Sequence, residues 1–180
     1  MQLELSDERL IVRPYHEDDV PLLFEAVRES IPEVSPWLGW CHENYSIVES
    51  REFIQSRAAK AQGDEWYSFG VFDRNDGRFL GGVGLNFINR VHQFGNLGYW
   101  VRTSATGKGV ASRASRLVAR FGLEELGLHR IEIVAAVSNV ASQRVAEKMG
   151  AVRECVARKR LLIRGAPQDA VVFSLVPEDL

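Results

Sequence analysis

In the first third of the chain, hydrophobic residues at helical spacing predict one amphipathic helix, and a capping-box pattern predicts the start of a second helix. The first predicted helix is Glu17–Glu29. Its apolar side is formed by Val20, Leu22, Leu23, Ala26 and Val27. The second is Ile47–Gln62, because Ser46 and Glu49 have the S-x-x-E spacing of a capping box. Prolines, the first of them Pro32, interrupt the pattern between the helices, where an ordered loop rich in Pro and Trp is expected.

Shorter apolar runs separated by turn residues predict strands along the rest of the chain. Asn75-Asp-Gly77 is a hairpin signal, and the short polar link Asn89–Gln93 predicts a second hairpin. Helical spacing returns over Lys108–Glu125 and Val140–Met149. The predicted strands are Arg9–Pro14, Trp66–Phe72, Phe79–Phe87, Phe94–Val101, Arg130–Val137, Val152–Ile163 and Ala170–Leu175. This order predicts an α/β fold with a central mixed sheet of about seven strands and about four helices.

Composition narrows the class of protein. No linker, repeat or low-complexity tract divides the pattern, so residues 1–180 are expected to form a single domain. With 46% hydrophobic and 26% charged residues and a net charge of −2, nothing indicates a nucleic-acid partner. The first residues are acidic and lack a basic n-region followed by an apolar run, and no apolar run approaches the ~20 residues that span a bilayer. A cytoplasmic protein without a membrane partner is therefore expected. Two distant cysteines, Cys41 and Cys155, predict neither disulfides nor a metal site.

The segment Gly98–Ser112 runs from a predicted strand through a glycine-rich turn into a helix. Gly107 and Gly109 allow a tight turn in which backbone N–H groups converge, and the helix adds unpaired N–H groups and the positive end of its dipole. An anionic ligand is therefore expected. A Walker-A loop would need glycine in place of Arg102 and Ser or Thr in place of Gly109, and a dinucleotide fingerprint would need glycine at Ser112. Neither motif fits.

A third phosphate-binding pattern fits better. Thr106-Gly-Lys-Gly-Val-Ala111 resembles the Q/R-x-x-G-x-G/A loop of the GNAT N-acetyltransferase superfamily, with Thr106 in place of Gln or Arg. Leu97-Gly-Tyr-Trp-Val101, Ser138–Ala151 and Arg9–Pro14 look like the RimJ/RimL branch, which acetylates protein N-terminal amines and related substrates. The resemblance spans nearly the whole chain in the family's order. It implies the GNAT acyltransferase fold, with a mostly antiparallel sheet, and an N-acetyltransferase that uses acetyl-CoA.

The resemblance also assigns the cofactor-binding residues. In a GNAT fold two central strands splay apart, the pantetheine arm of acetyl-CoA lies between them, and the pyrophosphate rests on the glycine loop. Val101, Arg102 and Thr103 are then expected to line the pantetheine, and the Val101 N–H to hydrogen-bond the thioester carbonyl as negative charge develops there. The phosphates are expected on the N–H groups of Gly107, Lys108, Gly109, Val110, Ala111 and Ser112.

Asn139 and Ser142 open the last predicted helix. Spacing by itself makes Asn139 an N-cap whose side chain accepts a hydrogen bond from the Ser142 N–H. In the RimJ/RimL pattern, Asn-x-x-Ser places the Asn against the cofactor arm and the Ser hydroxyl against the sulfur. Because a thiol of pKa ~8.5 is a stronger acid than a serine hydroxyl, Ser142 is expected to stabilise the departing sulfur by hydrogen bonding rather than by full proton delivery. Many GNAT enzymes use a C-terminal tyrosine here, but no tyrosine follows Tyr99.

The general base is not evident from the sequence. Some GNAT enzymes carry a Glu on the strand before the loop, but this chain has Asn96 there. At pH 7, neutralising a lysine of pKa ~10.4 costs about 4.6 kcal/mol, whereas an α-amine of pKa ~7.8 costs about 1.1 kcal/mol. An α-amine, such as the N-terminus of a ribosomal or other protein, is therefore favoured as the acceptor over a lysine side chain.

The acceptor is expected beside Ser35–Glu43, which resembles the variable wall of the family's site. Trp37 and Trp40 are expected to form an apolar lid, with packing in the core as the other interpretation, and His42 and Glu43 to relay a proton. No cysteine is placed to carry the acetyl group, so direct transfer in a ternary complex is expected.

Two other functions stay open at this point. One is an acetyltransferase for a small amine, such as an antibiotic, a polyamine or an aminoacyl nucleotide, since the acceptor loop cannot be decoded from one sequence. The other is a non-catalytic acyl-CoA-binding module, which the departures at Asn96 and Thr106 favour. The sequence leaves open whether the chain acts alone or as a homodimer.

Overall fold

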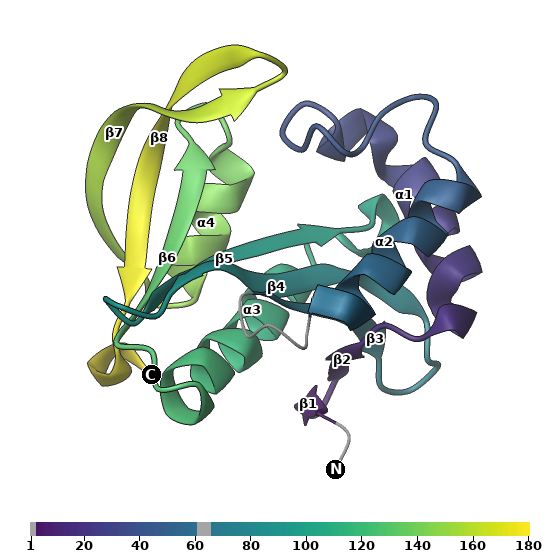
Figure 1. The fold of residues 1–180 in the computed structure, drawn as a ribbon, viewed down its shortest axis with the longest axis horizontal. Helices are drawn as coiled ribbons and strands as arrows, with labels where there is room; N and C mark the ends of the chain where they lie inside the picture. Colours follow the sequence, from purple (N-terminus) through teal and green to yellow (C-terminus); the bar gives the residue numbers. More distant parts are fainter. Residues whose placement is uncertain (1–2, 61–65) are drawn as a thin grey trace.

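The computed structural model describes residues 3–60 and 66–180 of the 180-residue chain. Its strands are β1 (Leu5–Ser6), β2 (Leu10–Pro14), β3 (Tyr67–Asp73), β4 (Phe79–Asn89), β5 (Phe94–Val101), β6 (Arg130–Ala136), β7 (Val152–Ile163) and β8 (Ala166–Leu175). Its α-helices are α1 (Val20–Val34), α2 (Ile47–Lys60), α3 (Val110–Arg120) and α4 (Val140–Lys148). In this part of the chain the strands form one mixed sheet, ordered β1-β2-β3-β4-β5-β6-β8-β7 (Figure 1). The predicted α/β fold is confirmed.

The elements follow the hydrophobic pattern closely. Both predicted hairpins form, because β3 pairs with β4 and β4 with β5 in antiparallel ladders. The sheet has eight strands, one more than expected, because the two residues of β1 are too few to give a periodic signal. The predicted third helix is divided between α3 and a wider π-helical turn over Phe121–Glu125. The predicted end of the second helix, at Gln62, lies outside the described residues.

Pro32 lies inside α1, so the prediction that the helix stops before this proline is wrong. A proline in a helix removes one hydrogen bond, here the bond to the carbonyl of Arg28, four positions earlier. The next turn is kept by the hydrogen bond from the Ser35 N–H to the Ile31 carbonyl, 3.0 Å. α1 therefore continues to the start of the loop that was predicted to receive the acceptor.

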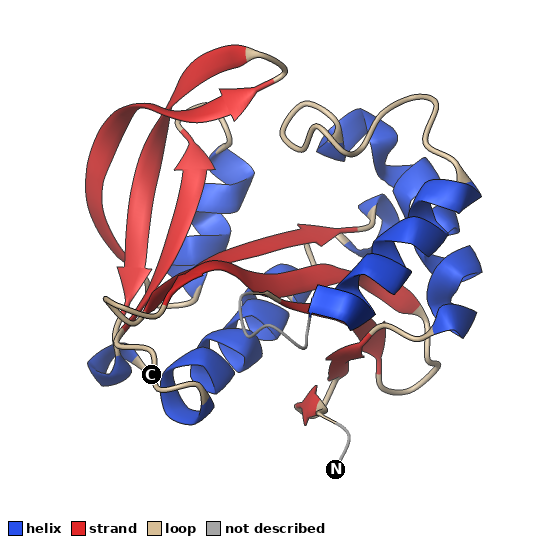
Figure 2. Ribbon diagram, in the orientation of Figure 1, coloured by secondary structure: helices blue, strands red, loops and turns tan. Residues whose placement is uncertain are grey.

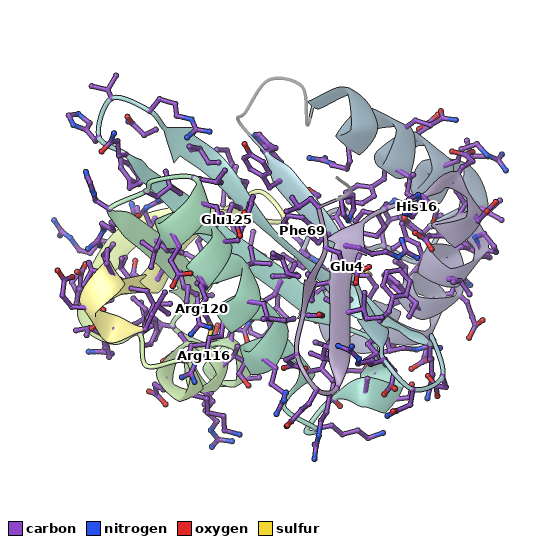
Figure 3. All side chains as sticks on the ribbon, turned by 90° about the horizontal axis from the view of Figure 1, so that it is seen from below. Glu4, His16, Phe69, Arg116, Arg120 and Glu125 are labelled. Carbon is purple, nitrogen blue, oxygen red and sulfur yellow. The ribbon has the colours of Figure 1, made fainter. Side chains whose placement is uncertain are left out.

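The two faces of the sheet are covered by different helices (Figure 2). Neighbouring residues of β3 point in opposite directions, as the period of two requires: Phe72 packs in a buried cluster with α1 and α2, and Val71 in a cluster with α3. Arg116 and Arg120 lie on the exposed side of α3, opposite the sheet (Figure 3). No helix in the described ranges is long and apolar enough to cross a membrane.

The sheet changes character between β5 and β6, the one parallel pair among the described strands. Their ladder spans only three residue pairs, from Phe94–Arg130 to Asn96–Glu132. Each strand continues beyond that point on its outer neighbour: β5 stays paired with β4 as far as Val101, and β6 with β8 as far as Ala136. The two strands therefore diverge, as Figure 1 shows, and the β5/β6 divergence leaves the end of β5 with a neighbour on one side only.

A buried ion-pair cluster fixes the end of β5 to α1. Arg102, immediately after β5, is only 5% exposed, and its guanidinium donates to Glu25 and Glu29 and to the Phe79 carbonyl. The hydrogen bonds from Arg102 lower the pKa of Glu29 to about 2. The Thr103 N–H donates to Ser30 Oγ in α1 at 3.1 Å. These contacts hold the end of the strand in a defined position.

We predict that Glu29→Gln lowers the free energy of unfolding by about 2 kcal/mol at pH 7. A carboxylate with a lowered folded-state pKa stabilises the protein above its unfolded-state pKa, and this contribution is lost as the pH falls toward the folded-state value. The difference between wild type and variant should therefore shrink below about pH 4.5. Urea unfolding between pH 7 and pH 3.5 measures both effects.

The matched control is Glu25→Gln, since Glu25 contacts the same arginine but is 69% exposed. It should cost only about 0.5 kcal/mol. Equal costs for the two variants, or a Glu29→Gln deficit that does not change with pH, would contradict the prediction.

Candidate functional site

The glycine loop presents a cluster of backbone N–H groups. Gly107 and Gly109 have φ angles of 74° and 78°, in the left-handed region where glycine has no steric penalty, and Gly109 is the N-cap of α3. The hydrogen bond from the Arg113 N–H to the Gly109 carbonyl, 3.1 Å, is the first of the helix. The N–H groups of Val110, Ala111 and Ser112 come before this hydrogen bond in the chain. As in any first helical turn, they have no carbonyl partner within the helix. This is the arrangement of an anion-binding helix start.

The backbone of Val101 faces the β5/β6 divergence. The Arg102 N–H donates to the Leu80 carbonyl at 2.9 Å, so the next pair of the β4–β5 ladder, Gly81 and Val101, is a non-hydrogen-bonded pair. In such a pair the N–H and C=O groups point away from the partner strand. The Val101 N–H therefore points toward the side from which β6 has moved away, which is the direction that the predicted thioester contact requires.

Other predicted cofactor-binding residues have side chains directed elsewhere. The Arg102 side chain is occupied by α1, and Thr103 Oγ1 donates to Glu33 at 2.8 Å. The Val110 side chain is buried against the core, and Lys108 Nζ donates to the Ser104 carbonyl at 2.9 Å. The structure thus offers the backbone of this segment, rather than its side chains, to a ligand.

Asn139 and Ser142 lie together at the start of α4. Asn139 Oδ1 accepts the Ser142 N–H at 3.1 Å, so the N-cap interpretation is confirmed. The Ser142 hydroxyl lies 3.0 Å from the hydroxyl of Tyr99, which also donates to the Ser142 carbonyl at 2.9 Å. Burial raises the pKa of Tyr99 to about 12, which keeps the phenol neutral and able to donate. Ser142 is therefore held from both its backbone and its side chain.

Tyr99 is a site residue that sequence reasoning missed. The family pattern points to a tyrosine near the C-terminus, whereas the tyrosine that contacts Ser142 in this structure is in β5, 43 positions earlier. Alternation along the strand was the available signal, because it places Leu97, Tyr99 and Val101 on one face. Tyr99 therefore shares a face with the residue chosen for the thioester contact.

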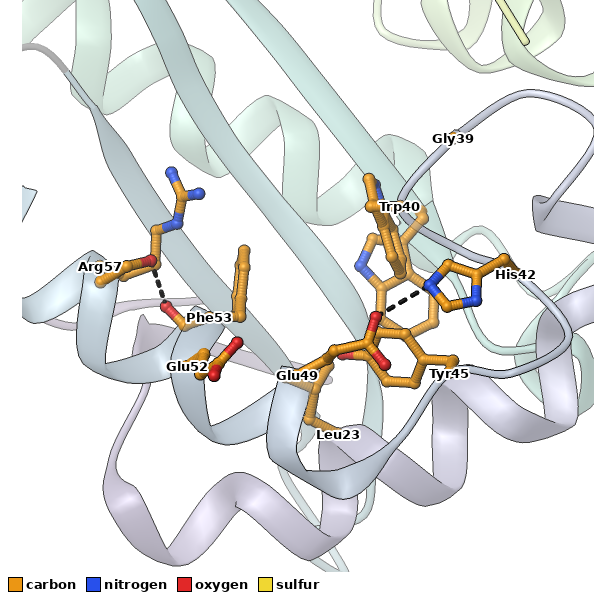
Figure 4. A pocket seen from close by; sticks show the side chains of 11 residues that line it. Leu23, Gly39, Trp40, His42, Tyr45, Glu49, Glu52, Phe53 and Arg57 are labelled. Carbon is orange, nitrogen blue, oxygen red and sulfur yellow. Dashed lines mark hydrogen bonds and ion pairs between the residues drawn. The ribbon is translucent and has the colours of Figure 1, made fainter.

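A pocket of about 470 Å³ lies beside the end of β5, on the face covered by α1 and α2 (Figure 4). Its lining combines aromatic rings with five titratable side chains. The lining residues are Leu23, Gly39, Trp40, His42, Tyr45, Glu49, Glu52, Phe53, Ser56, Arg57 and Trp100. We call this the α2 pocket. Its size suits a small ligand or the first residues of a peptide.

Two of the four predicted acceptor residues, Trp40 and His42, line the α2 pocket. Trp40 is 42% exposed and meets Trp100 edge to face at 5.6 Å, so it belongs to the pocket wall and not to the core. Trp37 and Glu43 are not among the lining residues. The loop Ser35–Glu43 therefore contributes two of its four predicted side chains to the lining of the pocket.

The predicted pairing of His42 with Glu43 needs correction. His42 Nε2 lies 2.8 Å from Oε1 of Glu49, on the first turn of α2. The other Glu49 oxygen accepts hydrogen bonds from the N–H and the hydroxyl of Ser46, at 2.8 and 2.9 Å, in the predicted capping box. The Ser46 backbone bond contributes most to lowering the Glu49 pKa, so this carboxylate is ionised near neutral pH. An ionised, fixed carboxylate thus orients the imidazole.

Asn96 does not take part in this pocket. Its amide donates to Asn86 Oδ1 across the β4–β5 ladder at 2.9 Å. The position where some GNAT enzymes carry a base is therefore used for a contact between strands. No group of three or more His, Cys, Asp or Glu side chains that could hold a metal ion occurs among residues 3–60 and 66–180.

Comparison with known proteins extends these observations. The Acetyltransferase (GNAT) domain family matches residues 9–152. The chain is 31% identical to the uncharacterized N-acetyltransferase YoaA of Bacillus subtilis, over 96% of both chains. It is 28% identical to the [Ribosomal protein uS5]-alanine N-acetyltransferase of Escherichia coli, over 99% of this chain and 93% of the other.

A solved structure shows the same fold at lower sequence identity. It is that of RimL, a ribosomal L7/L12 α-N-protein acetyltransferase in complex with coenzyme A. It superposes with a TM-score of 0.87 at 21% identity, over 97% of this chain and 98% of that one. The GNAT fold expected from the sequence is confirmed by this likeness.

Proposed function

Because the chain belongs to the GNAT acetyltransferase family and is an N-acetyltransferase, we propose that it transfers the acetyl group of acetyl-CoA directly to the N-terminal α-amine of a protein or peptide. The observation that carries the proposal is the end of β5. There the Val101 N–H, the Tyr99–Ser142 contact and the glycine loop all adjoin the β5/β6 divergence, and the α2 pocket adjoins Trp100. The relative named as a [Ribosomal protein uS5]-alanine N-acetyltransferase supports the choice of acceptor.

The backbone provides the binding and electrostatic part of the reaction. The N–H groups of residues 107–112 hold the phosphates of acetyl-CoA, helped by the positive end of α3. The Val101 N–H donates to the thioester oxygen as the amine nitrogen attacks the carbonyl carbon and that oxygen gains negative charge. Arg102, the residue after Val101, is anchored to α1 by its ion pairs. The Val101 N–H is therefore held in place and need not move during the reaction.

Ser142 acts on the leaving group. When the carbon–sulfur bond breaks, the thiolate carries the charge, and the Ser142 hydroxyl stabilises it by hydrogen bonding. Tyr99 supports this role because its neutral hydroxyl acts as the donor toward the carbonyl and hydroxyl oxygens of Ser142, which leaves the serine proton for the sulfur. The pair holds the serine in one position without adding a charge to the site.

His42 takes the proton that the attacking amine must lose, and Glu49 holds the imidazole in place. Both lie in the α2 pocket, where the carboxylates of Glu49 and Glu52 also attract the ammonium form of the acceptor. The cost of neutralising the amine decides the class of acceptor. An α-amine is favoured, since deprotonating it at pH 7 costs about 3.5 kcal/mol less than deprotonating a lysine.

We predict that Ser142→Ala lowers turnover by about tenfold or more and leaves the KM for acetyl-CoA nearly unchanged, because the hydroxyl acts on the leaving sulfur. Release of coenzyme A thiol under steady-state conditions measures both constants. Ser138→Ala is the matched control, since Ser138 is an exposed serine just before the N-cap of the same helix. Unchanged turnover in Ser142→Ala would remove this serine from the mechanism.

For the general base, we predict that His42→Gln lowers kcat/KM for an α-amine acceptor by about tenfold to a hundredfold at pH 7. The deficit should fall below about threefold at pH 9, because an α-amine of pKa ~7.8 is then mostly neutral without assistance. A pH–rate profile of both proteins tests this, with His92→Gln in the exposed β4–β5 turn as the control. A deficit independent of pH would argue against His42 as the base.

The choice of acceptor is tested with matched peptides. One has a free N-terminus and no lysine, and the other has a blocked N-terminus and a single lysine. We expect acetylation of the α-amine to be faster by at least about tenfold at pH 7, with an advantage that shrinks as the pH approaches ~10. Mass spectrometry locates the acetyl group, and a clear preference for lysine would overturn the proposed acceptor while leaving the transferase activity in place.

A further inference from the structure

Arg57, on the second half of α2, lines the α2 pocket with two hydrogen-bond donors unused. Its Nε and Nη1 atoms are buried and have no hydrogen-bond partner among residues 3–60 and 66–180. Buried polar groups are nearly always paired, and a cation more so than a neutral group. The arginine therefore needs an explanation that the acetyl-transfer steps above do not supply.

Aromatic rings hold this guanidinium in place. Its Cζ atom lies 4.8 Å from the centroid of the Phe53 ring and 4.8 Å from that of Trp66. Phe53 precedes Arg57 by one helical turn on α2, so the two side chains share a face. Stacking fixes the plane of the guanidinium but leaves its N–H groups, which point outward in that plane, free to donate.

The carboxylates of the pocket do not neutralise Arg57. Glu49 is engaged with Ser46 and His42, and no ion pair joins Arg57 to Glu49 or Glu52 within the described residues. Figure 4 shows Arg57 at one end of the pocket and His42 with Trp40 at the other. The α2 pocket thus has a basic end at Arg57 and, at His42, the end where the amine is expected to lose its proton.

This separation of charge describes a ligand with two charged groups. We propose that Arg57 binds a carboxylate of the acceptor while the acceptor amine lies at the His42–Glu49 end. The assignment rests on the proposed function, because it takes the α2 pocket as the acceptor site. A planar carboxylate offers the two oxygens that a stacked guanidinium with free donors can use. The carboxylate belongs either to an acidic side chain near the N-terminus of a peptide or to a small amino acid-like molecule.

The physical consequence is selectivity by charge. A carboxylate pairs with the donors of Arg57, whereas an amide of the same shape brings N–H groups or a weaker acceptor to a cation that is already desolvated. A site with buried donors rejects a ligand that leaves them unpaired more strongly than an apolar site rejects a ligand of the wrong size. The acidic acceptor should therefore be preferred, and mainly through KM.

The test uses pairs of acceptors that differ only in this group. In the peptide arm, two short peptides with the same free N-terminus carry Glu or Gln at the second position. In the second arm, a small amino acid is compared with its amide. For wild type we expect kcat/KM for the acidic member to exceed that of the amide by at least about tenfold in one arm. The arm that shows the preference identifies the source of the carboxylate.

Variants assign the preference to Arg57. Arg57→Gln should remove the preference by raising the KM for the acidic acceptor, and Arg57→Lys should restore part of the preference. The matched control is Arg51→Gln on the same helix, since Arg51 is exposed and contacts Glu17 instead. Circular dichroism and thermal melting confirm that each variant folds.

Two results would overturn the inference. One is an equal rate for the acidic and amide acceptors in both arms with wild type, which needs no variant and so does not depend on folding. The other is an undiminished preference in Arg57→Gln. Acetylation of peptides without any preference for charge would reject the role of Arg57 alone. Failure to acetylate every α-amine tested would instead reject the proposed function.

Discussion

The site depends on the short parallel ladder between β5 and β6. Three residue pairs join the strands, and beyond Asn96 and Glu132 each strand is held only by its antiparallel partner on the outer side. A strand that loses one neighbour still carries N–H and C=O groups that need partners. The Val101 N–H has no partner on β4 and points toward the β5/β6 divergence, so it is available to a ligand there. The backbone geometry on which the proposed oxyanion donor depends is thus a consequence of how the sheet is joined.

Local interactions then fix each chemical group around this divergence. The ion pairs of Arg102 with α1 hold the residue next to Val101, the Asn139 cap holds the backbone of Ser142, and the Ser46–Glu49 capping box fixes the carboxylate that faces His42. Each of these is an ordinary device for ending a strand or starting a helix. Because they lie next to Val101, Ser142 and His42, the same hydrogen bonds that stabilise the fold also orient the candidate site.

The parts that sequence reasoning found are those that depend on neighbours along the chain. Periodicity locates the strands and helices, the S-x-x-E spacing predicts the α2 cap, and Asn139 is recognised as a cap from its place before a helix. Contacts between distant segments were not accessible in this way. The pairing of His42 with Glu49 depends on the path of a loop, and the contact of Tyr99 with Ser142 joins a strand to a helix 43 positions later.

The acceptor loop shows why distant contacts decide the site. Arg164, in the β7–β8 turn, donates from Nε and Nη2 to the carbonyl and hydroxyl of Ser35, at 3.2 and 3.1 Å. Ser35 begins the loop that carries Trp40 and His42, and it follows α1, which Arg102 ties to β5. In addition to the parallel ladder and the Tyr99–Ser142 contact, Arg164 therefore ties the β7–β8 turn to the loop that follows α1. Neither partner reveals this contact in sequence, because it exists only once both halves have folded. It follows that contacts from both halves of the molecule position this loop. The same contacts orient Trp40 and His42 in the α2 pocket.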